Sequence, residues 1–413
     1  MDNLRSSVYG LLRSSERFFK TDMVYVGSGG FWLFFGQAVT VLASLGLAVA
    51  FANLVEPEKY GNYRYVLALA SIIGAFTLTG LTTAVTRATA RGHEGTLRYA
   101  FRLSMVWSIG MVFIALGASA YYFLRDNFFL SNALLIVGAT APIITAASLY
   151  RPFLMGKKAF KKAALFGIAQ SLIPTLSVLL GVLLKWPLLI LIALYFATSA
   201  LAVSILYVHA KRFAQNDTVD PKTDFLGKHL SVIGIIGAVG ERLDSILIFQ
   251  LLGGTELAIF SLATTLPDTL RGSLKNVDAL AMPKFVTKTK KEMKRAVWSK
   301  TTLIFLATLI VTTAYIAVAP TLFSILFPQY LQAIPYSQLY ALILPMTFVL
   351  ASAYFDAQAA VKERYILRIV NTITKITSVV IGIYFWGIWG AIIARIFSRA
   401  INAGLSVFFI ARN

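Results

Sequence analysis

Charged side chains interrupt several long apolar stretches of this 413-residue sequence. A charge near the centre of a bilayer costs roughly 2.5 to 3.5 kcal/mol on insertion scales, so such residues are expected to face protein or water and to mark a binding or transport path. The basic ones are Arg64, Arg242, Arg271, Lys275, Lys375, Arg395 and Arg399, and the acidic ones are Glu241, Asp244, Asp268 and Asp278.

Helical spacing places several of these charges on common faces. Asp268, Arg271, Lys275 and Asp278 fall within about 80° of one helix circumference. The amide of Asn371 lies one turn before a lysine, and Gln37 adds a polar group to the first apolar stretch. The pattern predicts a wet interior lined by these side chains.

Two interpretations compete for the basic residues. Their guanidinium and ammonium groups could bind a phosphate-bearing substrate. Alternatively, Arg271 could pair with Asp268, and Lys275 with Asp278, each one turn away.

Three of the other basic residues favour a cavity role. Lys375, Arg395 and Arg399 have no acid within four residues on the same helix, so local pairing cannot neutralise them. Arg399 could instead extend toward the membrane surface.

The acids have two interpretations of their own. Glu241 and Asp244 are candidate sites for coupling to Na⁺ or H⁺, as are Asp268 and Asp278, because an intramembrane carboxylate can change charge. Glu241 and Asp244 could equally be partners of Arg242. The sequence has no cysteine and three separated histidines, so we expect no transition-metal site and no cofactor.

Composition defines the elements that must position these residues. Hydrophobic residues make up 58% of the chain, and the mean hydropathy is +0.73. A span needs roughly 20 apolar residues, and we identify twelve candidates, which predict an all-α polytopic membrane protein: 31–54, 61–84, 100–123, 131–153, 163–184, 187–209, 230–252, 257–281, 302–319, 333–355, 365–386 and 389–410.

The net charge of +20 follows membrane topology and does not indicate nucleic acid. Of the 38 basic residues, 28 lie at the termini and at alternate connections, whereas the opposite side holds only Lys59, Arg125 and Lys185. The positive-inside rule therefore predicts both termini in the cytoplasm.

The chain divides into two halves of six spans. We expect an amphipathic cytoplasmic N-terminus at 1–28, an N-terminal lobe at 29–210, a polar cytoplasmic linker at 211–228 and a C-terminal lobe at 229–413. Similar residues recur 197 positions apart, which predicts a parallel pseudo-two-fold repeat: Leu54 with Leu251, Tyr63 with Phe260, Arg87 with Lys284, Arg91 with Lys288 and Arg98 with Arg295.

Enzymatic activity is not expected. The predicted outer connections are short, and the longest, 320–332, carries no charge. The cytoplasmic loops contain no Walker, Gly-x-Gly-x-x-Gly or Asp-x-Asp pattern.

Three segments carry a resemblance to a known family. Residues 54–70 (LVEPEKYGNYRYVLALA) are similar to the turn between spans 1 and 2 of Wzx-type oligosaccharide flippases. Residues 243–263 and 326–335 resemble the span 7 to span 8 signature and the segment before span 10. The superfamily also includes multidrug and toxic compound extrusion transporters and lipid II flippases.

The resemblance implies a V-shaped, alternating-access transporter of two six-helix lobes in a prokaryotic inner or plasma membrane. The implied partners are membrane lipids, glycan polymerase or ligase machinery and the cargo, a polyprenyl-diphosphate-linked oligosaccharide that moves from the cytoplasmic to the outer leaflet. The alternatives are a cation-coupled multidrug or metabolite antiporter of the same superfamily and a non-transporting scaffold for glycan assembly.

Overall fold

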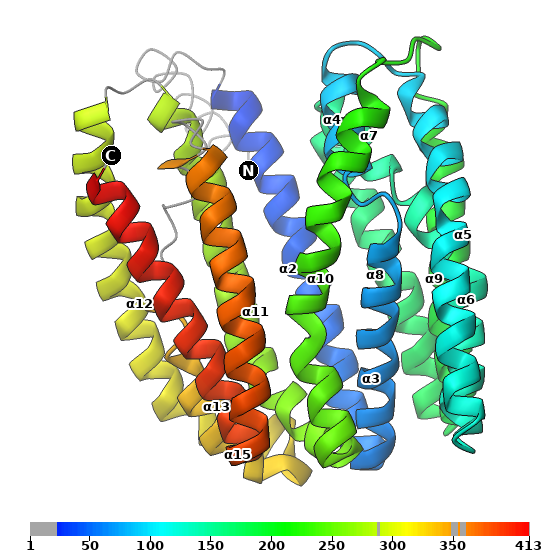
Figure 1. The fold of residues 1–413 in the computed structure, drawn as a ribbon, viewed down its shortest axis with the longest axis vertical. Coiled ribbons are helices and arrows are strands. Elements are labelled where there is room, and N and C mark those ends of the chain that lie inside the picture. Colours follow the sequence, from blue (N-terminus) through cyan, green and yellow to red (C-terminus); the bar gives the residue numbers. More distant parts are fainter. Residues whose placement is uncertain (1–22, 287–289, 348–353, 356–360, 413) are drawn as a thin grey trace, which may run out of the picture. The chain divides into compact units, whose positions relative to one another are not determined.

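The structure is a computed structural model that describes residues 23–286, 290–347, 354–355 and 361–412. Every regular element in these ranges is a helix (Figure 1). This follows from the long apolar runs, because a helix satisfies its backbone hydrogen bonds within its own segment in lipid. The predicted amphipathic N-terminus falls almost entirely outside the described residues.

Helices in the first half match predicted spans 1 to 6. They are α2 (Met23–Leu54), α3 (Pro57–Ile73), η1 (Gly74–Phe76), α4 (Leu81–Ala90), α5 (Thr96–Phe123), α6 (Phe128–Ala147), α7 (Tyr150–Gly156), α8 (Phe160–Leu183) and α9 (Leu188–Lys211). Span 2 is broken, because α3 and α4 are bent by 58° relative to each other.

Helices in the second half match predicted spans 7 to 12. They are α10 (Thr223–Leu252), α11 (Gly254–Val286), α12 (Lys290–Leu326), η2 (Pro328–Ala333), α13 (Ile334–Ala341) and α15 (Val361–Arg412). The last two predicted spans form one element, α15, which is interrupted at Gly387. The end of predicted span 10 lies partly outside the described residues.

Seven helices in the described ranges are long and apolar enough to cross a membrane, or eight if the bent pair is one span. The difference from twelve has two main causes. The stretch Ile369–Arg412 counts once although it covers two predicted spans. Helices α10 and α11 carry charges near their centres, which lower their hydropathy.

The chain divides into two compact units. The first comprises Met1–Leu47 and Leu69–Ala238, and the second comprises Ala48–Ala68 and Val239–Asn413. Residues 48–68 thus group with the second half, so α2 and α3 each contribute to both units. The predicted lobe limits at 210 and 229 stay a prediction.

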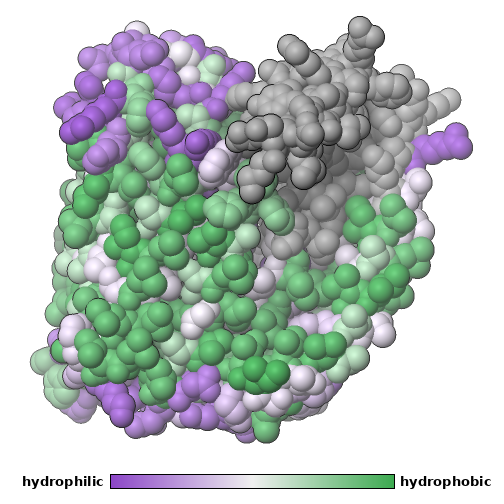
Figure 2. Space-filling model, turned by 180° about the vertical axis from the view of Figure 1, so that it is seen from behind, coloured by the Kyte–Doolittle hydropathy of each residue, from purple (hydrophilic) through white to green (hydrophobic). Residues whose placement is uncertain are grey.

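In the first unit, α5 packs against α6, α8 against α9, and α6 against α9 (Figure 1). Its core includes the fully buried Leu81, Val85, Leu97, Tyr150 and Phe153. On the face seen in Figure 2, this unit has a hydrophobic belt between two hydrophilic ends. Such a belt is the surface expected of a protein embedded in lipid.

The linker predicted at 211–228 is anchored to the first unit. The Glu94 carboxylate, in the turn between α4 and α5, accepts a 2.6 Å hydrogen bond from the backbone N–H of Gln215. Arg98 forms a 2.7 Å ion pair with Asp217. The linker therefore has a defined position on the turn that precedes α5.

Glycines allow close helix contacts in the second unit. A Cβ atom at Gly61 of α3 would overlap the backbone of Gly254 at the start of α11. In α15, Gly387 has φ 56° and ψ −131°, a conformation that favours glycine. The bend brings Gly382 and Gly390 so close that a Cβ on either would overlap the other's backbone.

Candidate functional site

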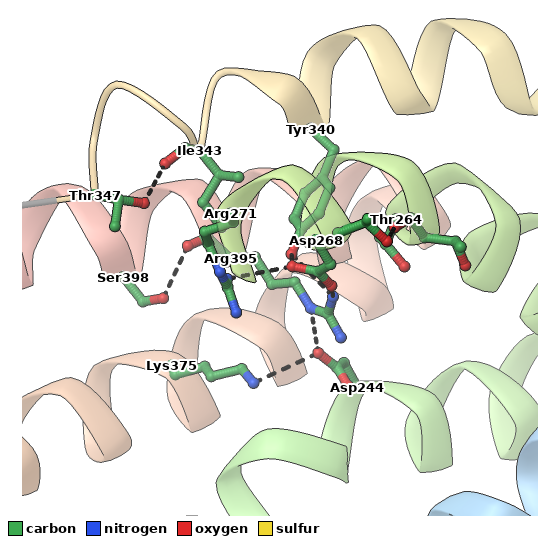
Figure 3. Close-up of polar contacts among 12 residues, drawn as sticks. Asp244, Thr264, Asp268, Arg271, Tyr340, Ile343, Thr347, Lys375, Arg395 and Ser398 are labelled. Atoms are coloured by element: carbon green, nitrogen blue, oxygen red, sulfur yellow. Dashed lines mark hydrogen bonds and ion pairs between the residues drawn. The ribbon is translucent and has the colours of Figure 1, made fainter. Parts of the chain in front are cut away.

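The second unit contains a buried acid that joins two helices (Figure 3). Asp244 of α10 is fully buried, and its Oδ2 lies 2.5 Å from Nε of Arg395 and 3.6 Å from Nζ of Lys375, both on α15. Burying a carboxylate is tolerated when it is paired and hydrogen-bonded. This one is balanced by two cations.

Arg395 occupies the middle of the cluster. Its Nη1 donates a 3.2 Å hydrogen bond to the Tyr340 hydroxyl of α13 and lies 3.7 Å from Oδ2 of Asp268. Its guanidinium also lies 4.7 Å from the ring centroid of Phe260, in cation–π geometry. One arginine thus connects residues from α10, α11, α13 and α15.

A second ion pair lies on α11. Arg271 Nη1 is 3.3 Å from Oδ1 of Asp268, which confirms the local pairing considered from the sequence. The same carboxylate oxygen accepts a 2.9 Å hydrogen bond from the Tyr340 hydroxyl. Asp268 is still 37% exposed, so it borders accessible space.

Some polar groups of the cluster lack partners among the described residues. Arg399, one turn after Arg395 on α15, forms no ion pair with any described side chain. Buried atoms without a hydrogen-bond partner in the described part of the chain include Nε of Arg271 and Oδ1 of Asn371. Such groups are unusual in folded proteins and identify capacity for a bound ligand or water.

Glu241 and Arg242 precede Asp244 on α10 and have exposed side chains. Arg64 of α3, in the same unit, contributes to the electrostatic environment of Arg242. A charged side chain exposed at this depth is costly against lipid, which favours an aqueous surface here.

The remaining predicted site residues are Gln37, Lys275 and Asp278. Gln37 is exposed on α2 within the first unit. The side chains of Lys275 and Asp278 lie outside the described part, so their predicted pairing stays a prediction.

The described site residues of the second unit have more positive than negative charge. The six basic residues are Arg64, Arg242, Arg271, Lys375, Arg395 and Arg399, and the three acidic residues are Glu241, Asp244 and Asp268. Even with every acid balanced, cationic groups remain to attract an anion.

Sequence reasoning missed the tertiary partner of Lys375 and Arg395. It searched for acids within four residues on the same helix, whereas Asp244 comes from another helix. It also missed Tyr340 and Phe260. The sequence did contain a signal for Phe260. It lies 197 positions after Tyr63, at the offset of the predicted repeat, and both aromatic rings are buried in the structure.

The fold and the charged cluster define a multi-pass helical membrane protein with a polar site inside its C-terminal unit. A sequence profile described as "Polysaccharide biosynthesis protein" matches residues 26–275. The chain belongs to this family. Comparison with curated protein sequences found no significant match.

Solved structures with a similar fold are transporters of the MOP superfamily. An outward-facing multidrug resistance MATE family transporter has 15% identity and a TM-score of 0.64, with 93% of this chain and 94% of that chain covered. An inward-facing structure described in the same words has 14% identity and a TM-score of 0.66, with coverages of 90% and 94%.

A third similar structure is a MOP superfamily transporter from Pyrococcus furiosus, whose binding pocket of reverse polarity is described as suggesting a different function. It has 16% identity and a TM-score of 0.65, and 94% of this chain and 95% of that chain are covered. These matches confirm the predicted all-α polytopic fold class.

Proposed function

We propose that this protein is a flippase for a lipid-linked oligosaccharide that carries a diphosphate. The observation that supports this most is the excess of cations in the second unit, where Arg399 has no described ion-pair partner and Arg271 has an unpartnered Nε. Guanidinium groups bind phosphate oxygens with two parallel hydrogen bonds. The family match to polysaccharide biosynthesis agrees with such a cargo.

The direction of transport in this proposal is from the cytoplasmic to the outer leaflet of a prokaryotic inner or plasma membrane. Both termini are in the cytoplasm, because the connections rich in lysine and arginine stay on that side. The sugar crosses beside the charged cluster while the polyprenyl tail stays in lipid.

Within the cluster, we assign different tasks to the cations. Arg395 and Lys375 are held by Asp244 and maintain the positive field of the site. Arg271 and Arg399 contact the diphosphate directly. The Asp268 carboxylate competes with the diphosphate for the Arg271 guanidinium. This competition weakens cargo binding enough to permit release.

Coupling to Na⁺ or H⁺ is a separate part of the proposal. The Asp244 carboxylate is paired with Lys375 and Arg395. The Asp268 carboxylate is paired with Arg271 and accepts a hydrogen bond from Tyr340. Glu241 is exposed and forms no ion pair with a described side chain, so it is the acid we assign to ion coupling. Glycan polymerase or ligase machinery is the proposed consumer of the flipped product.

Reconstitution tests the activity directly. Purified protein is placed in liposomes containing a fluorescent polyprenyl-diphosphate oligosaccharide, and loss of the label to an impermeant quencher reports transfer between leaflets. We expect Arg399→Gln to slow transfer at least tenfold, because one charge-assisted phosphate contact is worth roughly 1.5 to 3 kcal/mol. Arg125→Gln, which removes an exposed charge from the other unit, serves as the control.

Three results would contradict the proposal. Equal transfer of a glycolipid that lacks phosphate would show that the diphosphate is not recognised. Proton- or sodium-driven efflux of small organic cations, with no transfer of the glycolipid, would support the multidrug antiporter instead. Full glycan export by the Arg399→Gln and Arg271→Gln variants would favour the scaffold.

A further inference from the structure

A basic pocket lies outside the charged cluster, at the end of the first unit where the linker is anchored. It has a volume of about 450 Å³. Its lining residues are Arg87 and Arg91 at the end of α4, Pro221 and Lys222 just before α10, and Phe225 in the first turn of α10. All five residues have exposed side chains. Segments more than a hundred residues apart in the sequence thus form one pocket.

The positive charge of this pocket is largely uncompensated. Arg87 and the Lys222 ammonium group form no ion pair with any described residue. Arg91 lies 3.8 Å from Asp220, the only described acid paired with a pocket cation. That carboxylate also accepts a 2.9 Å hydrogen bond from the backbone of Lys222.

Neighbouring acids are already engaged elsewhere. Asp217 pairs with Arg98 at 2.7 Å, and Asp224 pairs with Lys228 at 2.7 Å. Only one of the three cations that line the pocket is therefore paired with a carboxylate, which leaves a net positive site of the kind that attracts phosphate.

The rest of the pocket wall, formed by Pro221 and Phe225, is apolar. Phe225 is 72% exposed. One turn further along α10, the Lys228 ammonium lies 5.8 Å from the ring centroid of Trp107, which is 46% exposed on α5. Exposed tryptophan beside lysine is typical of the boundary between acyl chains and headgroups.

We propose that this pocket binds the phosphate headgroup of an anionic phospholipid from the leaflet on its side of the membrane. Arg87, Arg91 and Lys222 contact the phosphate, and Phe225 packs against the first methylenes of an acyl chain. Basic pockets between membrane helices are suited to such headgroups. The site is independent of the cargo cluster and of the proposed transport activity.

Lipid binding to the purified full-length chain tests the proposal. The probe is short-chain phosphatidylglycerol added to protein in an uncharged detergent, with phosphatidylcholine of equal chain length for comparison. Affinity is obtained from the dependence of the melting temperature on lipid concentration. We expect the Arg87→Gln/Lys222→Gln variant to bind phosphatidylglycerol about 25-fold more weakly, since each basic residue near an anionic surface contributes roughly fivefold.

The matched control is Lys211→Gln/Arg212→Gln. It also removes two exposed charges from the same unit, but neither residue lines the pocket. We expect this variant to bind phosphatidylglycerol as the unaltered protein does. Without added lipid, all variants should melt at the same temperature. If the double variant does not fold, Lys222→Gln alone should still lose about fivefold.

Four outcomes would overturn the proposal. Equal losses in pocket and control variants would mean that binding is non-specific. Equal affinity for phosphatidylcholine would exclude recognition of the anionic headgroup. Competition by inorganic phosphate at the same concentration would assign the pocket to a free anion. Stronger binding of farnesyl diphosphate than of phosphatidylglycerol would assign it to the transported lipid.

Discussion

Asp244 connects two cations that the sequence places far away from it. It is fully buried, and its partners Lys375 and Arg395 are 18% and 14% exposed. Removing one member of a buried charge pair is far more costly than replacing the pair, because the remaining charge is left uncompensated. The cluster therefore has a structural task in addition to its proposed role with cargo.

This difference predicts the behaviour of substitutions at Asp244. We expect Asp244→Asn to reduce the stability of the protein by about 3 to 5 kcal/mol, observed as a lower melting temperature in detergent. The double variant Asp244→Asn/Lys375→Met should lose less than the single variant, since it removes one stranded charge together with the acid. An Asp244→Asn protein that melts like the original would contradict this account.

The positions of the helices depend on backbone bends and on contacts with the linker, neither of which can be predicted from hydrophobic periodicity. The bend in α15 depends on Gly387, whose φ of 56° and ψ of −131° belong to a region populated almost only by glycine. Because of this bend, α15 contains the last two predicted spans with no loop between them.

Substitution at the bend tests its importance. We expect Gly387→Ala to destabilise the protein by about 1 to 3 kcal/mol. Gly404→Ala, in the same helix and with no atom within 4 Å of an added Cβ, should stabilise it by up to about 1 kcal/mol. Thermal unfolding of both variants provides the measurement, and equal melting temperatures would exclude a role for the bend.

The linker anchor is a second feature at this scale. Glu94 is buried, and its carboxylate binds the Gln215 N–H and, at 2.7 Å, the Lys157 ammonium. Replacing Glu94 by Ala removes both contacts and leaves the Lys157 ammonium with its 2.7 Å hydrogen bond to the Phe213 carbonyl. We expect the linker then to loosen on the turn between α4 and α5.

Limited proteolysis measures this release. Trypsin should cleave Glu94→Ala several-fold faster after Lys211, Arg212 and Lys222, because protease reaches backbone that opens locally. The control is Glu56→Ala, which breaks an exposed ion pair with Lys59 and should leave linker cleavage unchanged. A linker equally resistant in both variants would show that Glu94 does not anchor it.

For the whole molecule, the distribution of basic residues predicts orientation. The chain has no cysteine, so single cysteines can be introduced without a background. We expect an impermeant maleimide to label Arg125→Cys in intact cells and to label Lys211→Cys only after the membrane is opened. Both positions are exposed. The reverse labelling pattern would invert the proposed direction of transport.

The fold class and the helix positions could be predicted from the sequence, because an apolar run long enough to cross lipid must form its hydrogen bonds locally. Residues 100–123 were predicted as a span and lie within α5. Charged positions inside the spans were equally visible, as Asp268 with Arg271 illustrates, because partners one turn apart follow from helix geometry.

Only the tertiary structure decided which charges meet across helices. Asp244 and Arg395 are 151 residues apart, and their contact depends on how α10 and α15 pack. The anchoring of the linker by Glu94 and the basic pocket around Arg87 have the same origin. Such contacts join segments that are far apart in the sequence. They therefore cannot be predicted from residue spacing or composition.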